Sequence, residues 1–428
     1  MFGLFASPDK KMRTNARNWL ELADKVWHYR RDQLNEADTR ELRGLTDELR
    51  VQVAAKADAN KLKLGIERLE PVLRRVGGKV YPKTALIENV EFFLIAAIVI
   101  IGIRTYFVQP FKIPTNSMWP SYYGMTPEVF TRPADEPGYL MQALRFVTFG
   151  ATSRRVDAPD DGEVMIPMFA SSRHAQIPYR DVPGRTWLVL PTTLKEYTIL
   201  VGRQPVTVKV PAEFDFEWAV RDAFFPQAAK SGDSARVDLA RLWAAQPEKL
   251  TDPSGRVQFL RTGKQVRKGE RVLSFDVLTG DQLFVDRVSY HFMRPKVGDG
   301  FVFNTRNLVG RPEGPPSEQY YIKRLVGVPG DKLEIRDFTL YRNGRPIEGS
   351  VAFGKNARRE DNYVGYRKER QMSEGQTMTV PADEFLPLGD NSANSMDGRY
   401  WGFVPKKDAI GRPLVIYFPF TRRWGPVR

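Results

Sequence analysis

A serine and a lysine carry the chemistry that this sequence offers. Ser117 lies in "FKIPTNSMWP", between two prolines and a few residues after a long apolar segment. The chain has no cysteine and three histidines, His28, His174 and His291, and no pair of them has zinc spacing. These counts disfavour disulfides, cysteine catalysis, a metal site and a histidine-dependent triad. A serine nucleophile would therefore need another base, and a neutral lysine can serve as one.

Lys323 lies in the strand-like run "YYIKRLVGV". Alternation along a strand places Tyr321, Lys323 and Leu325 on one face, so the lysine shares that face with apolar neighbours. Burial disfavours the ammonium form and lowers the pKa of a lysine. The run therefore fits a lysine that acts as a base, although it also fits an ordinary lysine that faces solvent.

A segment dense in small polar residues, "LGDNSANSMDGRYWGFVP", spans 388–405. It reads either as a polar turn before a strand or as support for a site. In the second interpretation it supplies a hydroxyl to orient Lys323 and an Asp397–Arg399 pair to brace the loop. Its other candidate site residues are Asp390, Asn391 and Ser395.

The element that must position Ser117 is the apolar segment 85–108, "ALIENVEFFLIAAIVIIGIRTYFV", whose core 92–103 carries no charge. A core this short also fits a buried helix or a signal peptide. Its charged residues lie at the two ends, where long side chains reach lipid headgroups, so we predict one uncleaved transmembrane helix. Lys and Arg are more numerous before the segment than directly behind it, which places the N-terminus in the cytoplasm and 109–428 outside.

Three further regions surround this span. Residues 1–84 read as amphipathic helices, either a small cytoplasmic bundle or a hairpin at the membrane surface. Residues 109–122 and 280–428 read as short strands with Pro and Gly turns, which favours a mainly β domain of sandwich or barrel type. Residues 123–279 mix Pro-rich loops, strands and a helix, which predicts an inserted α+β module. The ends of that module must lie close together, because Ser117 and Lys323 have to come within hydrogen-bond reach.

The net charge of +14 suits an anionic partner, either nucleic acid or acidic lipid headgroups. The basic residues are spread out, with no long Lys/Arg block, so a solvated surface explains most of the charge. The sequence contains no phosphate-binding loop and no dinucleotide fingerprint. We therefore predict no cofactor, no metal and no nucleic-acid partner.

Four motifs together resemble those of bacterial type I signal peptidases, which are membrane-bound peptidases with a Ser/Lys dyad. The motifs "IPTNSMWP", "RPKVGDGFVF", "YYIKRLVGVPGDKLEI" and "LGDNSANSMDGRYWGFVP" follow the family's order behind an apolar anchor, and the resemblance covers about 86–122 and 281–417. The chain departs from the family's pattern at four places. It has Asn116 where the family commonly has glycine, and Ser392-Ala393 where the family often has an Arg-Asp pair. It also has Gly398 in place of a serine and Gly300 in place of a β-branched residue. The serine and the lysine also lie 206 positions apart, against a few dozen in the family.

The resemblance implies a signal-peptidase-like β domain that removes signal peptides from secreted preproteins. It implies that Ser117 attacks the scissile carbonyl, that Lys323 is the base, and that the Ser117 N–H and the Thr115 hydroxyl stabilise the oxyanion. Ser395 would hydrogen-bond the Lys323 ammonium. The residues at substrate-wall positions are Ile113, Met118, Tyr321 and Ile322, and those that would support the loop are Asp390, Asn391, Asp397 and Arg399.

The resemblance also implies a setting, the bacterial cytoplasmic (inner) membrane. The implied partners are secretory preproteins, bound as an added β-strand, and membrane lipids. The protein-export machinery is a further candidate partner.

Three other interpretations compete with this one. A catalytically inactive, membrane-anchored homologue would act as a binding scaffold, which the intact Ser117 and Lys323 disfavour. A soluble self-cleaving repressor uses a similar Ser/Lys domain, which the apolar anchor disfavours. A Ser-x-x-Lys enzyme is the third, because "SPDK" (7–10) fits that pattern, although it lies in a polar N-terminal stretch.

Overall fold

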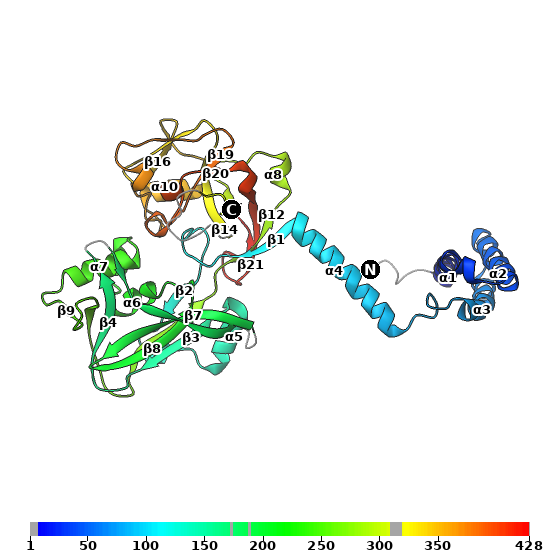
Figure 1. Cartoon of the computed structure of the whole chain (residues 1–428), viewed down its shortest axis with the longest axis horizontal. Helices are drawn as coiled ribbons and strands as arrows, with labels where there is room; N and C mark the ends of the chain where they lie inside the picture. Colours follow the sequence, from blue (N-terminus) through cyan, green and yellow to red (C-terminus); the bar gives the residue numbers. More distant parts are fainter. Residues whose placement is uncertain (1–6, 172–173, 187–189, 309–318, 428) are drawn as a thin grey trace. The chain divides into compact units, whose positions relative to one another are not determined.

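The computed structural model describes residues 7–171, 174–186, 190–308 and 319–427. By its internal contacts the chain divides into two compact units, Met1–Ile101 and Gly102–Arg428. Figure 1 colours the chain from blue at the N-terminus to red at the C-terminus.

The N-terminal unit contains a bundle of helices α1 (Pro8–Arg30), α2 (Glu36–Ala54) and α3 (Ala59–Val76), with a short turn η1 (Arg31–Gln33) between the first two. Their apolar faces share one core, which includes Leu20, Leu49 and Leu69. Ser7 caps α1, because its Oγ accepts a hydrogen bond from Lys10 N at 3.4 Å. The Ser-x-x-Lys pattern at this position is thus the capping sequence of a helix.

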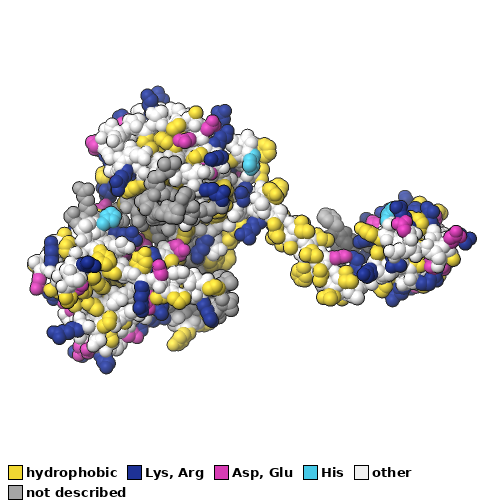
Figure 2. Space-filling model, in the orientation of Figure 1, with side chains coloured by type: hydrophobic (Ala, Val, Ile, Leu, Met, Phe, Trp, Pro, Cys, Tyr) yellow, Lys and Arg dark blue, Asp and Glu magenta, His cyan; other side chains and the backbone are white. Residues whose placement is uncertain are grey.

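Helix α4 (Ala85–Tyr106) is the one helix among the described residues that is long and apolar enough to cross a membrane. Its most apolar window has a mean hydropathy of 2.3, and none of that window is buried within the protein. Figure 2 shows hydrophobic side chains along this helix. The predicted segment ran to Val108, but the helix ends at Tyr106 because Val108 already pairs in a sheet.

The structure confirms the predicted mainly β domain. The main sheet joins strands in the order β1-β12-β21-β13-β14-β19-β20, and β22 pairs with β21. The bounds are β1 (Val108–Lys112), β12 (Gln282–Asp286), β13 (Gly300–Asn304), β14 (Tyr320–Gly327), β19 (Glu384–Leu388), β20 (Val404–Pro405), β21 (Ala409–Phe418) and β22 (Gly425–Pro426). Strand β1, before the insertion, therefore belongs to the same sheet as the C-terminal strands (Figure 1).

A smaller sheet lies beside it in the order β17-β16-β15-β18. Its strands are β15 (Lys332–Arg336), β16 (Thr339–Arg342), β17 (Arg345–Pro346) and β18 (Met378–Thr379). Asn343 and Gly344 have positive φ angles of 53° and 78°, as the type I′ hairpin turn favoured by an Asn-Gly pair requires. The helical pieces of this region are α8 (Ser289–Phe292), α9 (Val351–Arg358), α10 (Gly398–Trp401), η4 (Arg370–Met372), η5 (Ser392–Asn394) and η6 (Lys406–Asp408).

Residues 123–279 contain both helices and strands. One sheet runs β2-β11-β3 and another β6-β7-β4-β10-β9, with β5 paired to β4 and β8 to β7. The strands are β2 (Thr126–Val129), β3 (Thr152–Asp157), β4 (Gly162–Ala170), β5 (Ala175–Gln176), β6 (Tyr179–Thr186), β7 (Leu190–Val201), β8 (Gln204–Pro211), β9 (Leu250–Thr251), β10 (Gln258–Val266) and β11 (Arg271–Leu278). The helices are α5 (Tyr139–Phe149), α6 (Phe216–Phe224) and α7 (Ala235–Ala244), with short turns η2 (Pro133–Asp135) and η3 (Ala228–Ser231).

The two ends of the insert meet at Asp281. Ile113 N donates to the Asp281 carbonyl at 2.9 Å, and Asp281 N donates to the Tyr123 carbonyl at 2.8 Å. Gly280 has to be glycine, since a Cβ there would lie 1.9 Å from the Ile113 carbonyl oxygen. One hydrophobic core, with Phe214, Phe216 and Phe275 among its members, draws all its described residues from 125–277. We propose that 123–279 is a separately packed module.

We expect that replacing 125–278 by a short Gly/Ser linker leaves the anchored β domain folded. The ends that the linker must join are already adjacent, and loop-closure cost grows slowly with length. The measurement is thermal unfolding followed by circular dichroism of the detergent-solubilised variant. A matched control keeps the insert but replaces Phe275 by Asp, which should unfold the insert alone. A linker variant without a cooperative transition would mean that the insert is part of the β domain's core.

Candidate active site

The structure brings Ser117 and Lys323 together. Ser117 lies in the loop that follows β1, and Lys323 lies on the inner strand β14, opposite Phe301 of β13. Lys323 Nζ and Ser117 Oγ share a hydrogen bond across 206 positions of sequence. Only 8% of Ser117 and 4% of Lys323 is exposed. A nucleophile and an amine are thus paired in a nearly dry environment.

Burial lowers the pKa of Lys323 to about 8, because desolvation penalises the ammonium. The negative charge of Asp397 opposes this by favouring the ammonium, and Arg399 acts in the same direction as burial. Lys323 is therefore neutral in a large fraction of molecules at mildly alkaline pH, which a free lysine is not. A neutral amine beside a hydroxyl can accept its proton.

Arg324 and Asp390 form a buried ion pair next to the dyad. Arg324 Nε lies 2.8 and 2.9 Å from the two Asp390 carboxylate oxygens, and its Nη1 donates to the Gly298 carbonyl at 2.7 Å. Asp390 also accepts from Ser121 Oγ. The pair therefore joins strand β14, the serine loop and the polar loop.

Arg324 is a functional candidate that the sequence analysis did not single out. The available signal was the Lys-Arg dipeptide within an apolar strand. When both faces of a strand are buried, adjacent cations on it each need a partner of their own.

Asn391 holds the backbone beside the nucleophile. Its N–H donates to the Ser117 carbonyl at 3.1 Å, and its Nδ2 donates to the Asn116 carbonyl at 3.0 Å. The Asn116 side chain in turn donates to the Met125 carbonyl at 2.6 Å and accepts from Gly124 N at 3.0 Å. The asparagine that replaces the family's glycine thus connects the serine loop to the start of the insert.

Asp397 and Arg399 brace the polar loop from inside. Arg399 Nε donates to Asp397 Oδ1 at 2.9 Å, and neither side chain has exposed surface. Arg399 Nη2 also donates to the carbonyls of Ser392 at 2.7 Å and Ser395 at 3.0 Å. Burial alone would raise the pKa of Asp397, but Arg399 and the Gly389 N–H outweigh it, so the net pKa lies below the usual value.

The hydrogen bond predicted between Ser395 and the Lys323 ammonium is not formed in this structure. Ser395 Oγ is buried and has no hydrogen-bond partner in the described part of the chain. The reason is that Lys323 Nζ is oriented toward Ser117, while the Ser395 hydroxyl packs beside Gly389. Thr115 is exposed, and its predicted contact with the oxyanion of a bound substrate stays a prediction.

Comparisons with known proteins place this chain among peptidases. A family model described as "Signal peptidase, peptidase S26" matches residues 271–418, which include Lys323 and the polar loop but not Ser117. The signal peptidase I of Leptolyngbya laminosa is 34% identical over 142 residues, 33% of this chain and 62% of that protein, which is less than two thirds of its length. The signal peptidase I of Bacillus licheniformis is 32% identical over 141 residues, 30% of this chain and 73% of that protein. This chain belongs to the signal peptidase I family.

This chain is also similar to a solved structure of a signal peptidase I from Enterococcus faecalis V583. It shares 31% sequence identity and covers 28% of this chain and 97% of its own. The TM-score is 0.22, too low for that likeness to support any statement about the fold.

The predicted substrate-wall residues of this signal peptidase family member divide between two apolar clusters. Ile113 and Met118 are buried in one cluster, and Ile322 packs against it. Tyr321 packs against another cluster, where its ring meets Phe303. Met118 has no exposed surface, so it supports the site through packing and offers no surface of its own to a peptide. Tyr321 and Ile322 are half-buried and can offer surface to a peptide.

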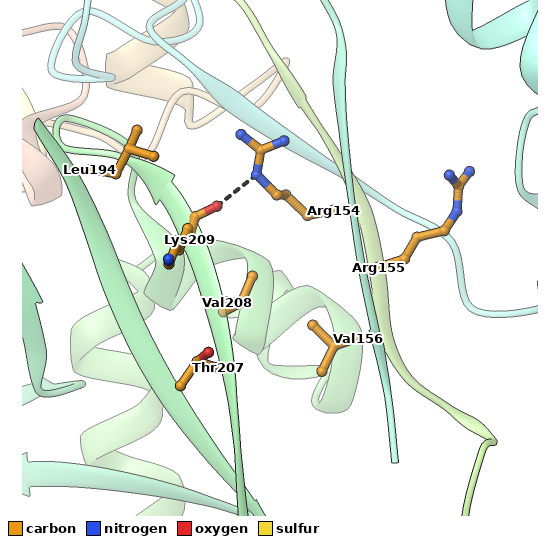
Figure 3. Close-up of a pocket in the computed structure, with 7 residues that line it drawn as sticks. All are labelled: Arg154, Arg155, Val156, Leu194, Thr207, Val208 and Lys209. Carbon is orange, nitrogen blue, oxygen red and sulfur yellow. Dashed lines mark hydrogen bonds between the residues drawn. The ribbon is translucent and has the colours of Figure 1, made fainter. Parts of the chain in front are cut away.

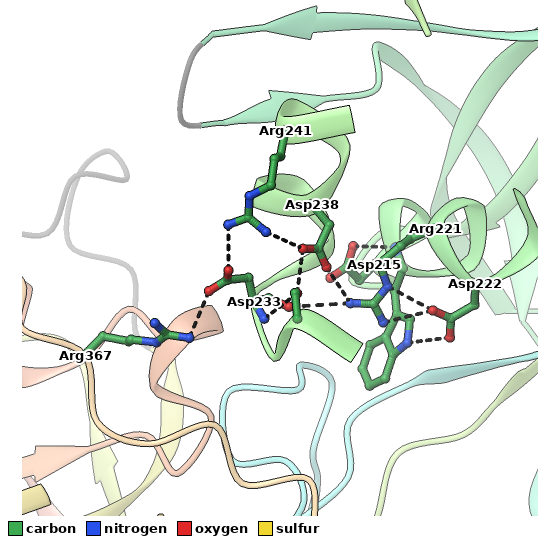
Figure 4. A network of polar contacts seen from close by, with 9 residues as sticks. Asp215, Arg221, Asp222, Asp233, Asp238, Arg241 and Arg367 are labelled. Atoms are coloured by element: carbon green, nitrogen blue, oxygen red, sulfur yellow. Dashed lines mark hydrogen bonds and ion pairs between the residues drawn. The ribbon is translucent and has the colours of Figure 1, made fainter. Parts of the chain in front are cut away.

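The insert also contacts the serine loop. Trp119 packs edge to face on Trp218 of α6, with ring centroids 5.5 Å apart. Asp233 of the insert accepts from Arg367 Nη2 at 2.9 Å and belongs to a polar network with Arg241 and Asp238 (Figure 4). Between these contacts lies a cavity of about 310 Å³ whose lining includes Trp119, Trp218 and Asn391. The insert therefore forms one wall of a cavity next to the nucleophile loop.

Another hollow, of about 300 Å³, lies wholly within the insert (Figure 3). Arg154 at its edge donates through Nε to the Lys209 carbonyl at 2.6 Å. Its lining residues are Arg154, Arg155, Val156, Leu194, Thr207, Val208 and Lys209, and none of them belongs to the site around Ser117. No group of acidic, histidine or cysteine side chains that could hold a metal occurs among the described residues.

We expect Lys323→Met to stabilise the folded chain at pH 7 by about 2 kcal/mol. A pKa of about 8 against 10.5 for a free lysine means that burying the amine costs about 3 kcal/mol below pH 8. The hydrogen bond to Ser117 returns about 1 kcal/mol of that cost. Between the two pKa values unfolding takes up a proton, so wild-type stability rises with pH across this window and the variant's advantage disappears above it.

Urea unfolding of the solubilised proteins at several pH values measures this difference. Lys332→Met, at an exposed lysine of β15, is the matched control and should change little. An advantage of Lys323→Met that stays constant from pH 7 to pH 11 would contradict the lowered pKa.

Proposed function

We propose that this chain is a membrane-bound serine endopeptidase that removes signal peptides from secreted preproteins. The observation that carries the proposal is the buried hydrogen bond between Ser117 and Lys323. Relatives named signal peptidase I support the reaction class. The domain that performs it would be the signal-peptidase-like β-sandwich or barrel of 109–122 and 280–428.

Neutral Lys323 takes the proton from Ser117 Oγ as the oxygen attacks the scissile carbonyl. The Ser117 N–H and the Thr115 hydroxyl stabilise the tetrahedral oxyanion. Lys323 then protonates the leaving amine and later activates the water that hydrolyses the acyl-enzyme. The lowered pKa of Lys323 supports this role, because a general base works best when its pKa lies near the working pH.

Ser395 is proposed to act when Lys323 carries the proton. Its hydroxyl is buried without a partner, and it lies beside Gly389. An ammonium that has lost its contact with the serine oxygen needs another acceptor, and a hydroxyl can rotate to supply one. The Asp397 charge, which favours the ammonium form of Lys323, stabilises the same state.

The substrate is proposed to bind as an added strand next to Tyr321 and Ile322, with small residues at the cleavage site. Ile113 and Met118 lie beneath the apolar surface that receives them. Asp390, Asn391, Asp397 and Arg399 hold the loop in place. Membrane lipids surround α4, and the protein-export machinery is a candidate source of substrate.

We propose that the chain spans the bacterial cytoplasmic membrane once. Residues 1–84 would form a cytoplasmic helical region, and 109–428 would lie outside. The support is the apolar, unburied helix α4 and the excess of Lys and Arg before it.

We expect Ser117→Ala and Lys323→Ala each to lower preprotein cleavage roughly 10³-fold or more while the fold survives. No cysteine exists to substitute for either residue. The wild-type rate should rise with pH and level off above an apparent pKa near 8, since only the neutral amine is a base. Cleavage of a purified preprotein by the detergent-solubilised chain is the assay.

Lys332→Ala is the control for loss of a lysine in a strand and should cleave normally. Near-normal turnover by Lys323→Ala would show that Lys323 is not the base that activates Ser117. Equal inactivity of wild type and Ser117→Ala toward several preproteins would favour a binding scaffold instead.

We expect protease added to intact spheroplasts to digest 109–428 and to spare 1–84. Epitope tags at the two ends of the chain report which part survives. Lysed spheroplasts should lose both tags, which controls for intrinsic resistance of the N-terminal bundle. Protection of the C-terminal tag in intact cells would overturn the orientation.

A further inference from the structure

Helix α5 (Tyr139–Phe149) turns its polar side toward the protein. Arg145 Nε donates to Asp276 Oδ2 at 3.0 Å, and the carboxylate of Asp276 is 1% exposed. Arg145 also pairs with Glu128. Gln142 Nε2 donates to the carbonyl of Pro137 at 2.7 Å. No residue of the helix is buried. Polar side chains therefore attach this helix to the insert.

The apolar side of α5 faces outward. Leu140, Ala143, Leu144 and Val147 follow the i, i+3, i+4, i+7 spacing that normally marks a face packed on a core. Leu140 is nevertheless 87% exposed, Leu144 54% and Val147 65%. Fully burying side chains of this size is worth about 1.5–3 kcal/mol each. The stripe therefore lacks the apolar partner that its pattern requires.

The apolar surface continues beyond the helix. Phe420 N donates to the Thr148 carbonyl at 3.0 Å, which joins the end of α5 to the segment behind β21. Phe420 and Trp424 are 56% and 57% exposed, and their ring centroids lie 6.4 Å apart. An apolar helix side thus merges with exposed aromatic rings, and such rings favour a membrane–water interface.

The chain itself indicates the partner. Strand β1 starts at Val108, directly after the candidate span, and Arg287 N donates to the Phe107 carbonyl at 3.0 Å. Only Phe107 therefore separates the span from the sheet along the chain. Phe418 pairs with Gln282, and Gln282 with Lys112, which is four residues or about 13 Å along β1 from its start. A connection this short keeps the α5 surface at high local concentration near any bilayer that α4 crosses.

We propose that α5 lies in the headgroup–acyl boundary of the membrane and gives the insert a second contact with the lipid surface. Amphipathic helices bind there with their apolar side in the boundary. The inference rests on the proposed membrane anchoring of α4 and is independent of the Ser/Lys dyad. The helix belongs to 123–270, outside the region matched by the signal peptidase family model. The contact would hold the insert, and the cavity wall it supplies beside Ser117, at the membrane surface.

The natural chain has no cysteine, so single labels are unambiguous. Leu140→Cys and the control Glu248→Cys, at an exposed position of the insert, each receive an environment-sensitive fluorophore in the full-length protein. Both are reconstituted in vesicles of phosphatidylethanolamine and phosphatidylglycerol, with or without spin-labelled acyl chains. We expect a blue-shifted emission and strong quenching by spin-labelled lipid at position 140, and neither effect at position 248.

A second variant separates the helix surface from the anchor. Leu144→Asp with Val147→Asp, labelled at position 140, should lose the quenching while its circular dichroism and its cleavage of a preprotein in detergent stay unchanged. The same labels in the Ser117→Ala background should be quenched as before, so failure of the peptidase assignment would leave this result intact.

Two outcomes overturn the proposal. One is a label at position 140 that stays as exposed to water as the label at position 248. The other is shielding that appears only at high protein-to-lipid ratio together with cross-linking between copies through position 140, which would assign the surface to a second copy of the chain.

Discussion

The site depends on keeping one amine dry while it touches one hydroxyl. Burial of Lys323 lowers its pKa, and a buried amine is tolerated only where its neighbours are satisfied. Arg324 is neutralised by Asp390, and Arg399 by Asp397, so neither arginine is left as a buried unpaired charge. These pairs hold the strand, the serine loop and the polar loop in one arrangement. Loss of one partner would leave an unpaired buried charge, which is strongly destabilising. The pairs therefore favour this one arrangement of the loops over others, whatever their net contribution to stability.

More than 150 residues separate the strand before Ser117 from the next strand of the same sheet. The chain leaves and returns through hydrogen bonds at Asp281, so the spacing of Ser117 and Lys323 does not depend on the length between them. Asn116 extends the same bonding from the serine loop to the insert's first strand. Contacts through Trp218 and Asp233 then place the insert against the site instead of leaving it as a free appendage.

Sequence reasoning succeeded where the signal was local. A long apolar helix and an Asn-Gly turn follow from short-range preferences. It could not show that Ser395 Oγ lacks a partner in this structure, because which acceptor an amine selects depends on the positions of two loops that are distant in sequence. It passed over Arg324 for a similar reason. A residue type does not reveal that the carboxylate completing its ion pair lies 66 positions further along the chain.

The amino-acid sequence by itself determined which groups this protein has: a serine and a lysine in a chain without cysteine and with few histidines, a long apolar segment, and strands with their turns. Those properties belong to side-chain chemistry and to periodicities of a few residues. Only the tertiary structure decided that the lysine is buried against the serine, that the ends of the insert meet at Asp281, and that α5 presents its apolar side outward. Each of these is a property of surroundings, because a pKa, a contact or an exposed face is set by neighbours that folding supplies.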